Sequence, residues 1–346
     1  MARLRTVSPN SRGWTRRRSG KGFVYLDDNG VRLTAEHVAR IKDLVIPPAW
    51  QDVWICPLPN GHIQAVGVDD AGRRQYLYHP DWRVKRDQKK FDRVAEVAKK
   101  LPRARAAILE HLALEGMPVE RAVATAVRLL DLGYFRIGSD AYADANGSFG
   151  LTTLEKRHVR RRKDVMVFKF EGKSGIEHEI EIDDPLAVAA VDTMRRRRGG
   201  GDRLLAYKQT RSWTPMDAAL VNDYLREATG ADITAKDFRT WHATVLAAAA
   251  LAASLEPGDT KASRKRAVSG AMKEVASSLG NTPTIARSSY VDPRVIDLYE
   301  DGVTIETAVR RSYDSPDERQ RAMERAVSRM LASAPKQSGR RARSGR

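Results

Sequence analysis

The sequence has few of the residues that build disulfides and metal sites. Cys56 is the single cysteine among 346 residues, which excludes an intramolecular disulfide. The seven histidines show no His-x-x-x-His pair and no other zinc-ligand spacing. Glu177, His178 and Glu179 are adjacent, but neighbouring side chains on a strand point to opposite faces and cannot converge on one ion. We therefore expect no bound metal.

Segments for membrane insertion, secretion and nucleotide binding are also missing. No apolar run approaches the ~20 residues that cross a bilayer. The basic N-terminus is not followed by the apolar stretch of a secretory signal. No Gly-x-x-x-x-Gly-Lys-Ser/Thr loop is present, since Gly172-Lys173-Ser174 lacks the upstream glycine. We expect a cytoplasmic protein without membrane contact or cofactor, in which any phosphoryl chemistry uses side-chain cations and protons.

Positive charge is the strongest feature of the composition. The chain has 61 Lys and Arg against 44 Asp and Glu, a net charge of +17. Such a field attracts polyanions, so nucleic acid is the first candidate partner, ahead of an acidic membrane surface or a ribosome. Residues 1–22 carry seven basic and no acidic side chains, and residues 336–346 carry five and none. Both ends are typical of flexible arms that grip phosphates.

The pattern from residue 22 to about residue 82 indicates short strands separated by turns. Residues 23–26 and 31–33 flank Asn29-Gly30, a typical hairpin turn. Residues 53–58, 62–68 and 73–78 repeat this pattern across Asn60-Gly61 and Asp70-Ala71-Gly72. We predict an N-terminal antiparallel β-sheet domain over residues 1–90.

The remainder, residues 91–346, has mainly helical spacing of apolar residues, with a basic tail from about residue 335. Two alternating segments within 165–182 flank the turn Gly172–Gly175 and predict one β-hairpin. The fold class is α+β, with a small sheet domain followed by a larger helical domain. The predicted helices cover residues 91–114 with a break at Pro102, a segment opened by Pro118, 186–196, 215–228, 237–255, 264–279 and 316–332.

Four side chains in this second domain can each be interpreted in two ways, as ordinary structural or surface residues or as functional ones. Arg136, between apolar neighbours in a turn, is either a structural ion pair or an anion ligand. Lys173, at the hairpin tip, is either a solubilising residue or a proton donor that reaches DNA. Arg239, in the first turn of a helix, opposes the helix dipole unless a phosphate lies between them. Tyr290, in a polar loop, is either a packing residue or a nucleophile.

Together and in this order, these positions resemble the catalytic domain of type IB DNA topoisomerases of the bacterial and poxvirus kind. That domain shares its fold with tyrosine recombinases. The resemblance extends from about Gly22 to about Tyr299. The blocks that carry it are 135–138 (FRIG) with 148–154 (SFGLTTL), the Gly-Lys hairpin, 236–241 (KDFRTW), and 281–283 (NTP) followed by Tyr290.

The resemblance implies a role for each of these residues. Tyr290 attacks a DNA phosphorus and leaves a 3′-phosphotyrosine, while Arg136 and Arg239 hold the nonbridging oxygens. Lys173 protonates the departing 5′-oxygen. Asn281 stands where the family usually has histidine, so it keeps a neutral donor without a cationic form. We expect from this a modest effect on activity and a weaker dependence on pH near neutrality.

The resemblance also implies DNA contacts outside the catalytic residues. Gln75, Tyr76 and Tyr78 lie on a segment similar to the DNA-facing strand of the family, although ordinary strand packing is the other interpretation. Lys236 lies one turn before Arg239 and is a candidate phosphate contact. His242, one turn after Arg239, is an alternative donor or simply a core or surface histidine.

Three functions are consistent with these patterns. The first is a monomeric, nucleoid-associated type IB topoisomerase that clamps duplex DNA and relaxes it without ATP or metal. The second is a site-specific tyrosine recombinase, which usually has a helical N-terminal domain and a His-x-x-Arg box. Here the N-terminal domain is rich in strands and Lys236 takes the histidine position, which favours the topoisomerase. The third is a noncatalytic basic DNA-binding protein.

Overall fold

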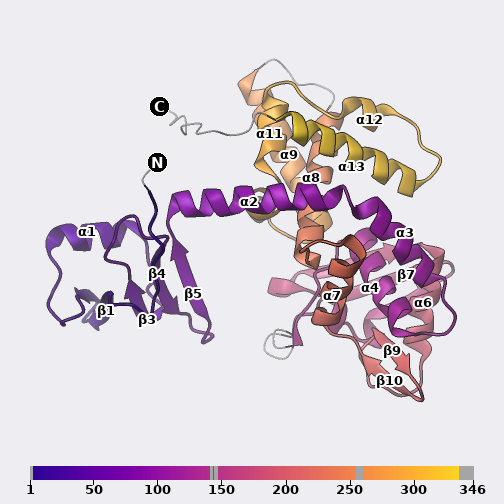
Figure 1. Ribbon diagram of the computed structural model, residues 1–346, viewed down its shortest axis with the longest axis horizontal. Coiled ribbons are helices and arrows are strands. Elements are labelled where there is room, and N and C mark those ends of the chain that lie inside the picture. Colours follow the sequence, from indigo (N-terminus) through magenta and orange to yellow (C-terminus); the bar gives the residue numbers. More distant parts are fainter. Residues whose placement is uncertain (1–2, 141–142, 144–146, 255–259, 335–346) are drawn as a thin grey trace. The chain divides into compact units, whose positions relative to one another are not determined.

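The computed structural model describes residues 3–140, 143, 147–254 and 260–334 (Figure 1). The basic tail expected from about residue 335 lies outside the described residues. The chain divides into two compact units, Met1–Asp92 and Arg93–Arg346. The division falls inside helix α2 (Pro80–Ala98), two residues after the boundary expected at residue 90.

The N-terminal unit is built on a five-stranded antiparallel sheet in the order β2-β1-β3-β4-β5. The small core of this unit contains side chains from alternate strand positions together with Ile41 of α1. Ile55 of β3 is fully buried in it. The turn before β5 is closed by Asp69, as the Asp-Ala-Gly sequence predicts. The elements are β1 (Trp14–Ser19), β2 (Gly22–Leu26), α1 (Ala35–Asp43), β3 (Gln51–Ile55), β4 (Ile63–Val68) and β5 (Arg74–Tyr78).

The structure corrects two expectations for this unit. Part of the presumed N-terminal arm forms β1, anchored by the buried ring of Trp14 and by Arg16, which donates to three backbone carbonyls. β2 pairs with β1, and the predicted Asn29-Gly30 turn is also present: Leu26 bridges Arg32, and the NH groups of Asp27 and Leu33 donate to the carbonyls of Val31 and Tyr25 at 2.9 and 3.0 Å. Residues 31–33 therefore follow β2 as a short pairing segment. The segment between them and β3 contains α1, which the strand-rich interpretation missed.

The second unit is mainly helical and has one continuous apolar core. Helices α4 and α8 are buried on most of their surface, as expected for helices inside a bundle. All the predicted helices are present, with ends shifted by a few residues, and α2 begins eleven residues earlier than expected. The helices are α3 (Leu101–Leu112), α4 (Val119–Gly133), α6 (Pro185–Arg196), α7 (Ala218–Thr229), α8 (Ala235–Ala253), α9 (Lys261–Leu279), α10 (Pro283–Ile285), α11 (Pro293–Glu300), α12 (Glu306–Arg310) and α13 (Pro316–Ser333).

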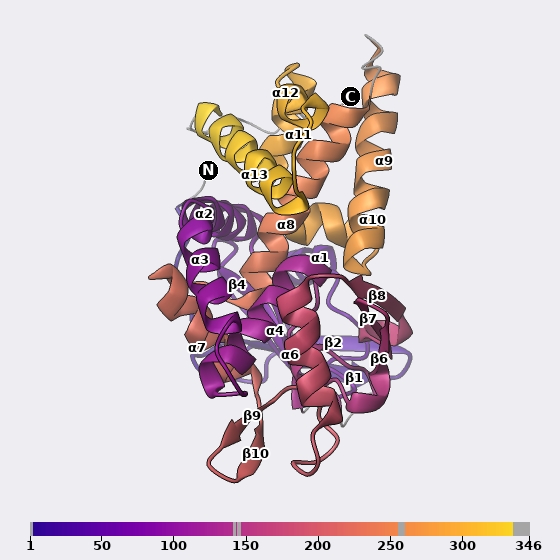
Figure 2. The same ribbon diagram turned by 90° about the vertical axis from the view of Figure 1, so that its right-hand side faces the viewer.

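Two small antiparallel sheets are inserted among these helices. The predicted hairpin is confirmed, since β7 pairs with β8 around the Gly172–Gly175 turn, and β6 adds a third strand. Figure 2 shows the lower end of α9, continued by α10, beside this sheet. Among the described residues, no helix combines the length and the apolar character needed to span a membrane. The strands are β6 (Val159–Arg162), β7 (Val165–Glu171), β8 (Glu177–Ile182), β9 (Ala206–Gln209) and β10 (Ser212–Pro215).

Candidate active site

Arg136 reaches the site from the turn that follows α4. Tyr134 ends this helix in the left-handed conformation (φ 52°), and the fully packed ring of Phe135 then anchors the chain in the core. Arg136 extends from this anchor to the end of α9. Its Nη2 donates to the carbonyl of Gly280 at 2.8 Å and to Oδ1 of Asn281 at 2.6 Å. Two segments about 145 residues apart are thereby joined at one guanidinium.

Arg239 is buried in α8, with only 3% of its surface exposed. Its Nη1 donates to the carbonyl of Tyr134, and its Nη2 donates to the carbonyl of Leu279 at 2.8 Å. The start of α8 is closed by a capping box between Thr234 and Asp237, so the helix dipole already has a partner. Arg239 lies just beyond the first turn of α8, two residues further into the helix than expected, and its guanidinium points across to the end of α9.

The two arginines create a strongly positive, partly buried site. Among the described residues, neither forms an ion pair with a carboxylate, and the Nε of Arg239 is buried without a hydrogen-bond partner. Burial lowers the pKa of Arg239 to about 10, the charge of Arg136 adds to this, and Tyr290 opposes it. Burial likewise lowers the pKa of Arg136, and Tyr290 again opposes the effect. Both stay cationic near neutral pH, so the site favours an anion.

Asn281 follows the helix cap at the end of α9. Gly280 takes the left-handed cap conformation (φ 57°), and the backbone NH of Asn281 then donates to the carbonyl of Ala276 at 2.9 Å. The cap conformation and this hydrogen bond fix the amide beside Arg136. Its Oδ1 accepts from that arginine, whereas its Nδ2 is buried and has no partner among the described residues. The amide therefore has one NH2 group left to donate.

Tyr290 ends a π-helical turn, Ala286–Tyr290, rather than lying in an irregular loop. The turn is closed by the bond from the NH of Val291 to the carbonyl of Ala286, at 3.0 Å. π-Helical turns are rare and often occur at functional sites. The tyrosine ring is half-buried, and the guanidinium carbon of Arg239 lies 5.4 Å from its centre. The phenol therefore lies against the cationic site.

Lys173 is exposed at the tip of the β7–β8 hairpin. The tip is tight, because Ser174 has a positive φ of 66° and the NH of Gly172 donates to the carbonyl of Ile176 at 2.8 Å. The hairpin reaches the end of α9 through His178 of β8, whose ring lies against Gly280. From the sequence, His178 was considered only as a metal ligand, because a strand pattern does not show which distant residue a side chain faces.

The two other candidate residues of α8, Lys236 and His242, differ in exposure. Lys236 is exposed one turn before Arg239, as a phosphate contact requires. His242 is 3% exposed and faces the core, where its Nε2 lies 3.1 Å from Oδ1 of Asp131. His242 is thus a core histidine, the alternative that the sequence left open.

His242 belongs to a buried cluster of charged side chains beneath the site. Arg105 donates to Asp131 at 2.7 Å and to Glu324 of α13 at 2.6 Å. Burial alone would raise the pKa of Asp131, but Arg105 and His242 outweigh it and hold this pKa well below its usual range. The rings of Tyr134 and His242 pack with their centres 4.9 Å apart. The backbone carbonyl of Tyr134 accepts a hydrogen bond from Arg239. The cluster therefore supports the backbone that holds Arg239.

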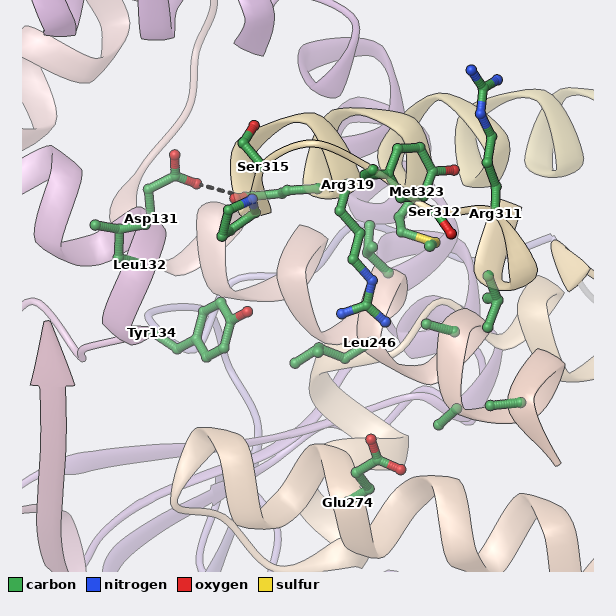
Figure 3. Close-up of a pocket in the computed structure, with 18 of the residues that line it drawn as sticks. Asp131, Leu132, Tyr134, Leu246, Glu274, Arg311, Ser312, Ser315, Arg319 and Met323 are labelled. Atoms are coloured by element: carbon green, nitrogen blue, oxygen red, sulfur yellow. Dashed lines mark hydrogen bonds between the residues drawn. The ribbon is translucent and has the colours of Figure 1, made fainter. Parts of the chain in front are cut away.

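A cavity of about 880 Å³ lies beside this cluster. Figure 3 shows Tyr134 on one side, Arg319 pointing toward Leu246, and the hydrogen bond between Asp131 and Gln320. Among the described residues that line it, none is one of the five candidate catalytic residues. The cavity is therefore separate from the cationic site.

The candidate DNA contacts in the N-terminal unit lie on β5. The rings of Tyr76 and Tyr78 stack with centres 5.9 Å apart, and Arg86 of α2 lies 5.4 Å from the centre of the Tyr78 ring. Gln75 alternates with them and donates to Asp69 at 2.9 Å. The strand therefore puts the two tyrosines on one face and Gln75 on the other, so the three do not form one contact surface.

The described residues contain no group of three or more His, Cys, Asp or Glu side chains arranged for a metal ion. The ligands that the cationic site can take are instead anions with several oxygens. Two guanidiniums and one amide offer planar N–H donors to such oxygens, and a phenol lies within reach of the same charges.

Comparison with known proteins gives matches along most of the chain. Residues 79–311 match the family described as Eukaryotic DNA topoisomerase I, catalytic core, and residues 22–69 match Bacterial DNA topoisomerase IB, N-terminal domain. The DNA topoisomerase 1B of Acanthamoeba polyphaga mimivirus is 30% identical over 296 residues, which cover 83% of this chain and 88% of the viral protein. The DNA topoisomerase I of Monkeypox virus and the DNA topoisomerase 1B of Vaccinia virus (strain Copenhagen) are each 21% identical over 291 residues, with the same coverage.

Proposed function

We propose a catalytic mechanism for this chain on the premise that it belongs to the type IB DNA topoisomerase family. Its substrate is duplex DNA, and its reaction is the relaxation of supercoils by transient cleavage of one strand. The phenol oxygen of Tyr290 bonds to a backbone phosphorus, and the bond from that phosphorus to the 5′-oxygen breaks. The products are a 3′-phosphotyrosine and a free 5′-hydroxyl. The duplex then swivels about the intact strand before the reverse reaction reseals the cut one.

Arg136 and Arg239 bind the nonbridging oxygens of the scissile phosphate. Attack gathers negative charge on these oxygens, and guanidiniums already fixed by backbone carbonyls neutralise it without rearranging. A donor of this kind contributes a factor of about 10²–10³ to the rate. Neither arginine has a carboxylate partner within the part of the chain that the structure describes, which supports the assignment, since a phosphate supplies the missing negative charge.

Asn281 donates its Nδ2–H to a nonbridging oxygen. Support comes from its geometry, because Oδ1 is occupied by Arg136 while the buried Nδ2 has no partner among the described residues. A buried NH2 group without a partner is costly, and a phosphate oxygen satisfies it. The amide therefore fills the role that a neutral histidine fills elsewhere in the family.

Lys173 protonates the departing 5′-oxygen. An alkoxide is too basic to leave unaided, and a positioned acid contributes about 10²–10⁴-fold. The proton passes from Nζ to the 5′-oxygen as the bond to phosphorus breaks, and it returns during religation. The phenol proton of Tyr290 passes to water.

The covalent intermediate retains the energy of the broken phosphodiester bond. The free 5′-hydroxyl can therefore attack the phosphotyrosine and regenerate the strand without ATP. The cationic side chains supply the charge stabilisation that a metal ion supplies in other phosphoryl-transfer enzymes. We accordingly propose that relaxation proceeds in the absence of added metal.

Further contacts to the DNA backbone come from exposed residues. Lys236 is placed one turn before Arg239 and can reach a neighbouring phosphate. Tyr76 and Tyr78 form an aromatic face flanked by arginine, which suits the sugar-phosphate backbone and base edges. Gln75 is a weaker candidate, since its amide is engaged by Asp69.

Because one chain supplies all five candidate catalytic residues, we propose that a monomer acts on DNA. Its place of action is the cytoplasm, at the nucleoid, because its substrate is chromosomal duplex DNA.

The observation that carries this proposal is the convergence of Arg136, Arg239, Asn281 and Tyr290 on the end of α9. The test is incubation with supercoiled plasmid in EDTA without ATP. The wild-type protein is expected to give relaxed topoisomers, whereas Tyr290→Phe binds DNA and relaxes none. Relaxation by Tyr290→Phe would contradict the choice of nucleophile, and a requirement for metal would contradict the proposed chemistry.

A further inference from the structure

His178 of β8 lies in a slot between two glycines that precede two of the candidate catalytic residues. A methyl group built on Gly280 would lie 2.1 Å from Cε1 of the imidazole and 2.8 Å from Nε2. One built on Gly172 would lie 2.6 Å from Cδ2 and 2.7 Å from Nε2. The Nε2 edge of the ring therefore fills the gap between the two glycine backbones.

The glycine at position 172 is explained by this ring and not by backbone conformation. Gly172 has φ −96°, which is open to any residue, so only the imidazole excludes a side chain there. Gly280 differs, because its φ of 57° also favours glycine. The face of the imidazole stacks on Phe170 with centres 5.1 Å apart and planes 16° apart. Phe170 in turn packs on Phe135, so the ring rests on the core.

The residues on either side of the slot belong to the proposed mechanism. Gly172 is bonded to Lys173, the proposed acid, and Gly280 is bonded to Asn281. The carbonyl of Gly280 also accepts from Arg136. A shift of the imidazole would therefore move the hairpin tip relative to the phosphate-binding groups.

The surroundings of the ring keep it uncharged. Burial lowers the pKa of His178, and the positive charges of Arg136 and Arg239 lower it further. A neutral imidazole can pack against backbone and Phe170 without adding a third positive charge beside the two arginines. The ring acts as a rigid, flat spacer, and its Nε2 edge faces the backbones of Gly172 and Gly280.

We propose that His178 is a positioning residue for the general acid: its ring seats the Lys173 turn against the Gly280–Asn281 end of α9. The proposal rests on the proposed role of Lys173 as the acid. Removal of the ring leaves the phosphate-binding arginines in place but frees the hairpin tip. A displacement of about 1 Å can lower a rate about 10²-fold, so the effect should be large at the leaving-group step.

The test is single-turnover strand cleavage on two matched substrates. One has the normal 5′-oxygen at the scissile bond, and the other has a bridging 5′-sulfur, which leaves without protonation. His178→Ala is expected to cleave the oxygen substrate about 10²-fold more slowly than the wild type. On the sulfur substrate, most of this loss is expected to disappear. An equal loss on both substrates would overturn the proposal, because the ring would then act through the phosphate or through folding.

Gly172→Ala is the second variant, and it keeps the imidazole. Its methyl group displaces the ring, so it should reproduce the same pattern of a loss that sulfur rescues. In the His178→Ala background the methyl meets no ring, and the double variant should cleave no more slowly than His178→Ala alone. Additive losses would contradict the shared slot. Noncovalent DNA binding and thermal unfolding of each variant serve as folding controls.

Lys173→Ala separates failure of this inference from failure of the proposed function. If sulfur does not rescue Lys173→Ala, the assignment of the acid is wrong. If sulfur rescues Lys173→Ala but not His178→Ala or Gly172→Ala, the acid is correct and the positioning role of His178 is wrong.

Discussion

Asn281 stands at the position where the resemblance to type IB topoisomerases implies a histidine. Its Oδ1 accepts from Arg136, and its Nδ2 is the atom that we assign to the phosphate. Asn281→Asp keeps the shape and the acceptor but replaces the donor with a negative charge. We expect cleavage to slow by at least about 10²-fold, because a donor is lost and the phosphate is repelled.

The measurement is single-turnover cleavage, with thermal unfolding as the control for folding. Asn281→His is the matched variant, since it restores a donor that can also become cationic. It should retain activity close to that of the wild type and gain a dependence on pH between about 6 and 8. Wild-type activity in Asn281→Asp would show that Nδ2 does not contact the phosphate.

Among the helices, α3 is joined to α4 and to α13 by one buried arginine, Arg105 of α3. Arg105 bonds both Asp131 and Glu324, and all three side chains are at least nine-tenths buried. Arg105→Ala leaves two buried carboxylates without their partner. We expect it to lower the free energy of unfolding by about 3–5 kcal/mol, measured by denaturant titration at neutral pH.

Arg226→Ala is the matched control, because Arg226 pairs with Asp223 on the exposed surface of α7 at 2.9 Å. It should change stability by less than about 1 kcal/mol. The pKa of Asp131 is lowered on folding, so its contribution is present above its unfolded pKa of about 3.9 and is lost as pH falls further. The difference between the wild type and Arg105→Ala should therefore shrink below about pH 4. A penalty that grows in acid would contradict this account.

Successive side chains of strand β5 point to opposite faces of the sheet, so the candidate DNA contacts on this strand lie on two different faces. Tyr76 is 39% exposed beside Tyr78, whereas Gln75 bonds to Asp69 in the preceding turn. Tyr76→Ala should weaken noncovalent DNA binding more than Gln75→Ala does, as measured by fluorescence anisotropy in the Tyr290→Phe background. A larger effect of Gln75→Ala would place the DNA on the opposite face of the strand.

The sequence predicted elements well where apolar spacing decides them. The predicted helices of the second unit and the β7–β8 hairpin have clear periodicity and agree with the structure, whereas α11 and α12 were not predicted. The sequence did not predict β1, because most of its side chains are arginine or other exposed residues. Arg16 is held by backbone carbonyls, and a sequence pattern does not reveal such contacts. α1 had a readable signal, since Thr34 caps it and Val38 and Ile41 have helical spacing.

The candidate site was predictable as a set of residues but not as an arrangement. The motifs selected Arg136, Arg239, Asn281 and Tyr290, yet their spacing does not show that two of them share the end of α9. Arg239 was assigned to the start of its helix on a dipole argument, whereas its bonds run to Tyr134 and Leu279. His178 was considered only as a metal ligand, because its partners, Gly172 and Gly280, are defined only by the tertiary fold.

For the chain as a whole, the net charge of +17 predicts binding that depends strongly on salt. Each neutralised phosphate releases counterions, and a protein with several such contacts loses about 10³-fold or more in affinity from about 50 mM to about 200 mM salt. We expect a fall of this size for Tyr290→Phe on duplex DNA. Lys236→Ala should reduce the slope of log K against log salt by about one, whereas an unchanged slope would remove Lys236 from the phosphate contacts.

The proposed chemistry requires that one phenol, Tyr290, becomes bonded to the 3′ end of a DNA strand between the two guanidiniums. The direct measurement uses a duplex whose cleaved strand is labelled on the 5′ side and cannot be religated. After denaturation and proteolysis, the label should be recovered on the peptide that contains Tyr290, joined through the 3′-phosphate. Tyr290→Phe should give no adduct. Recovery of the label on another peptide, or an adduct with Tyr290→Phe, would contradict the account.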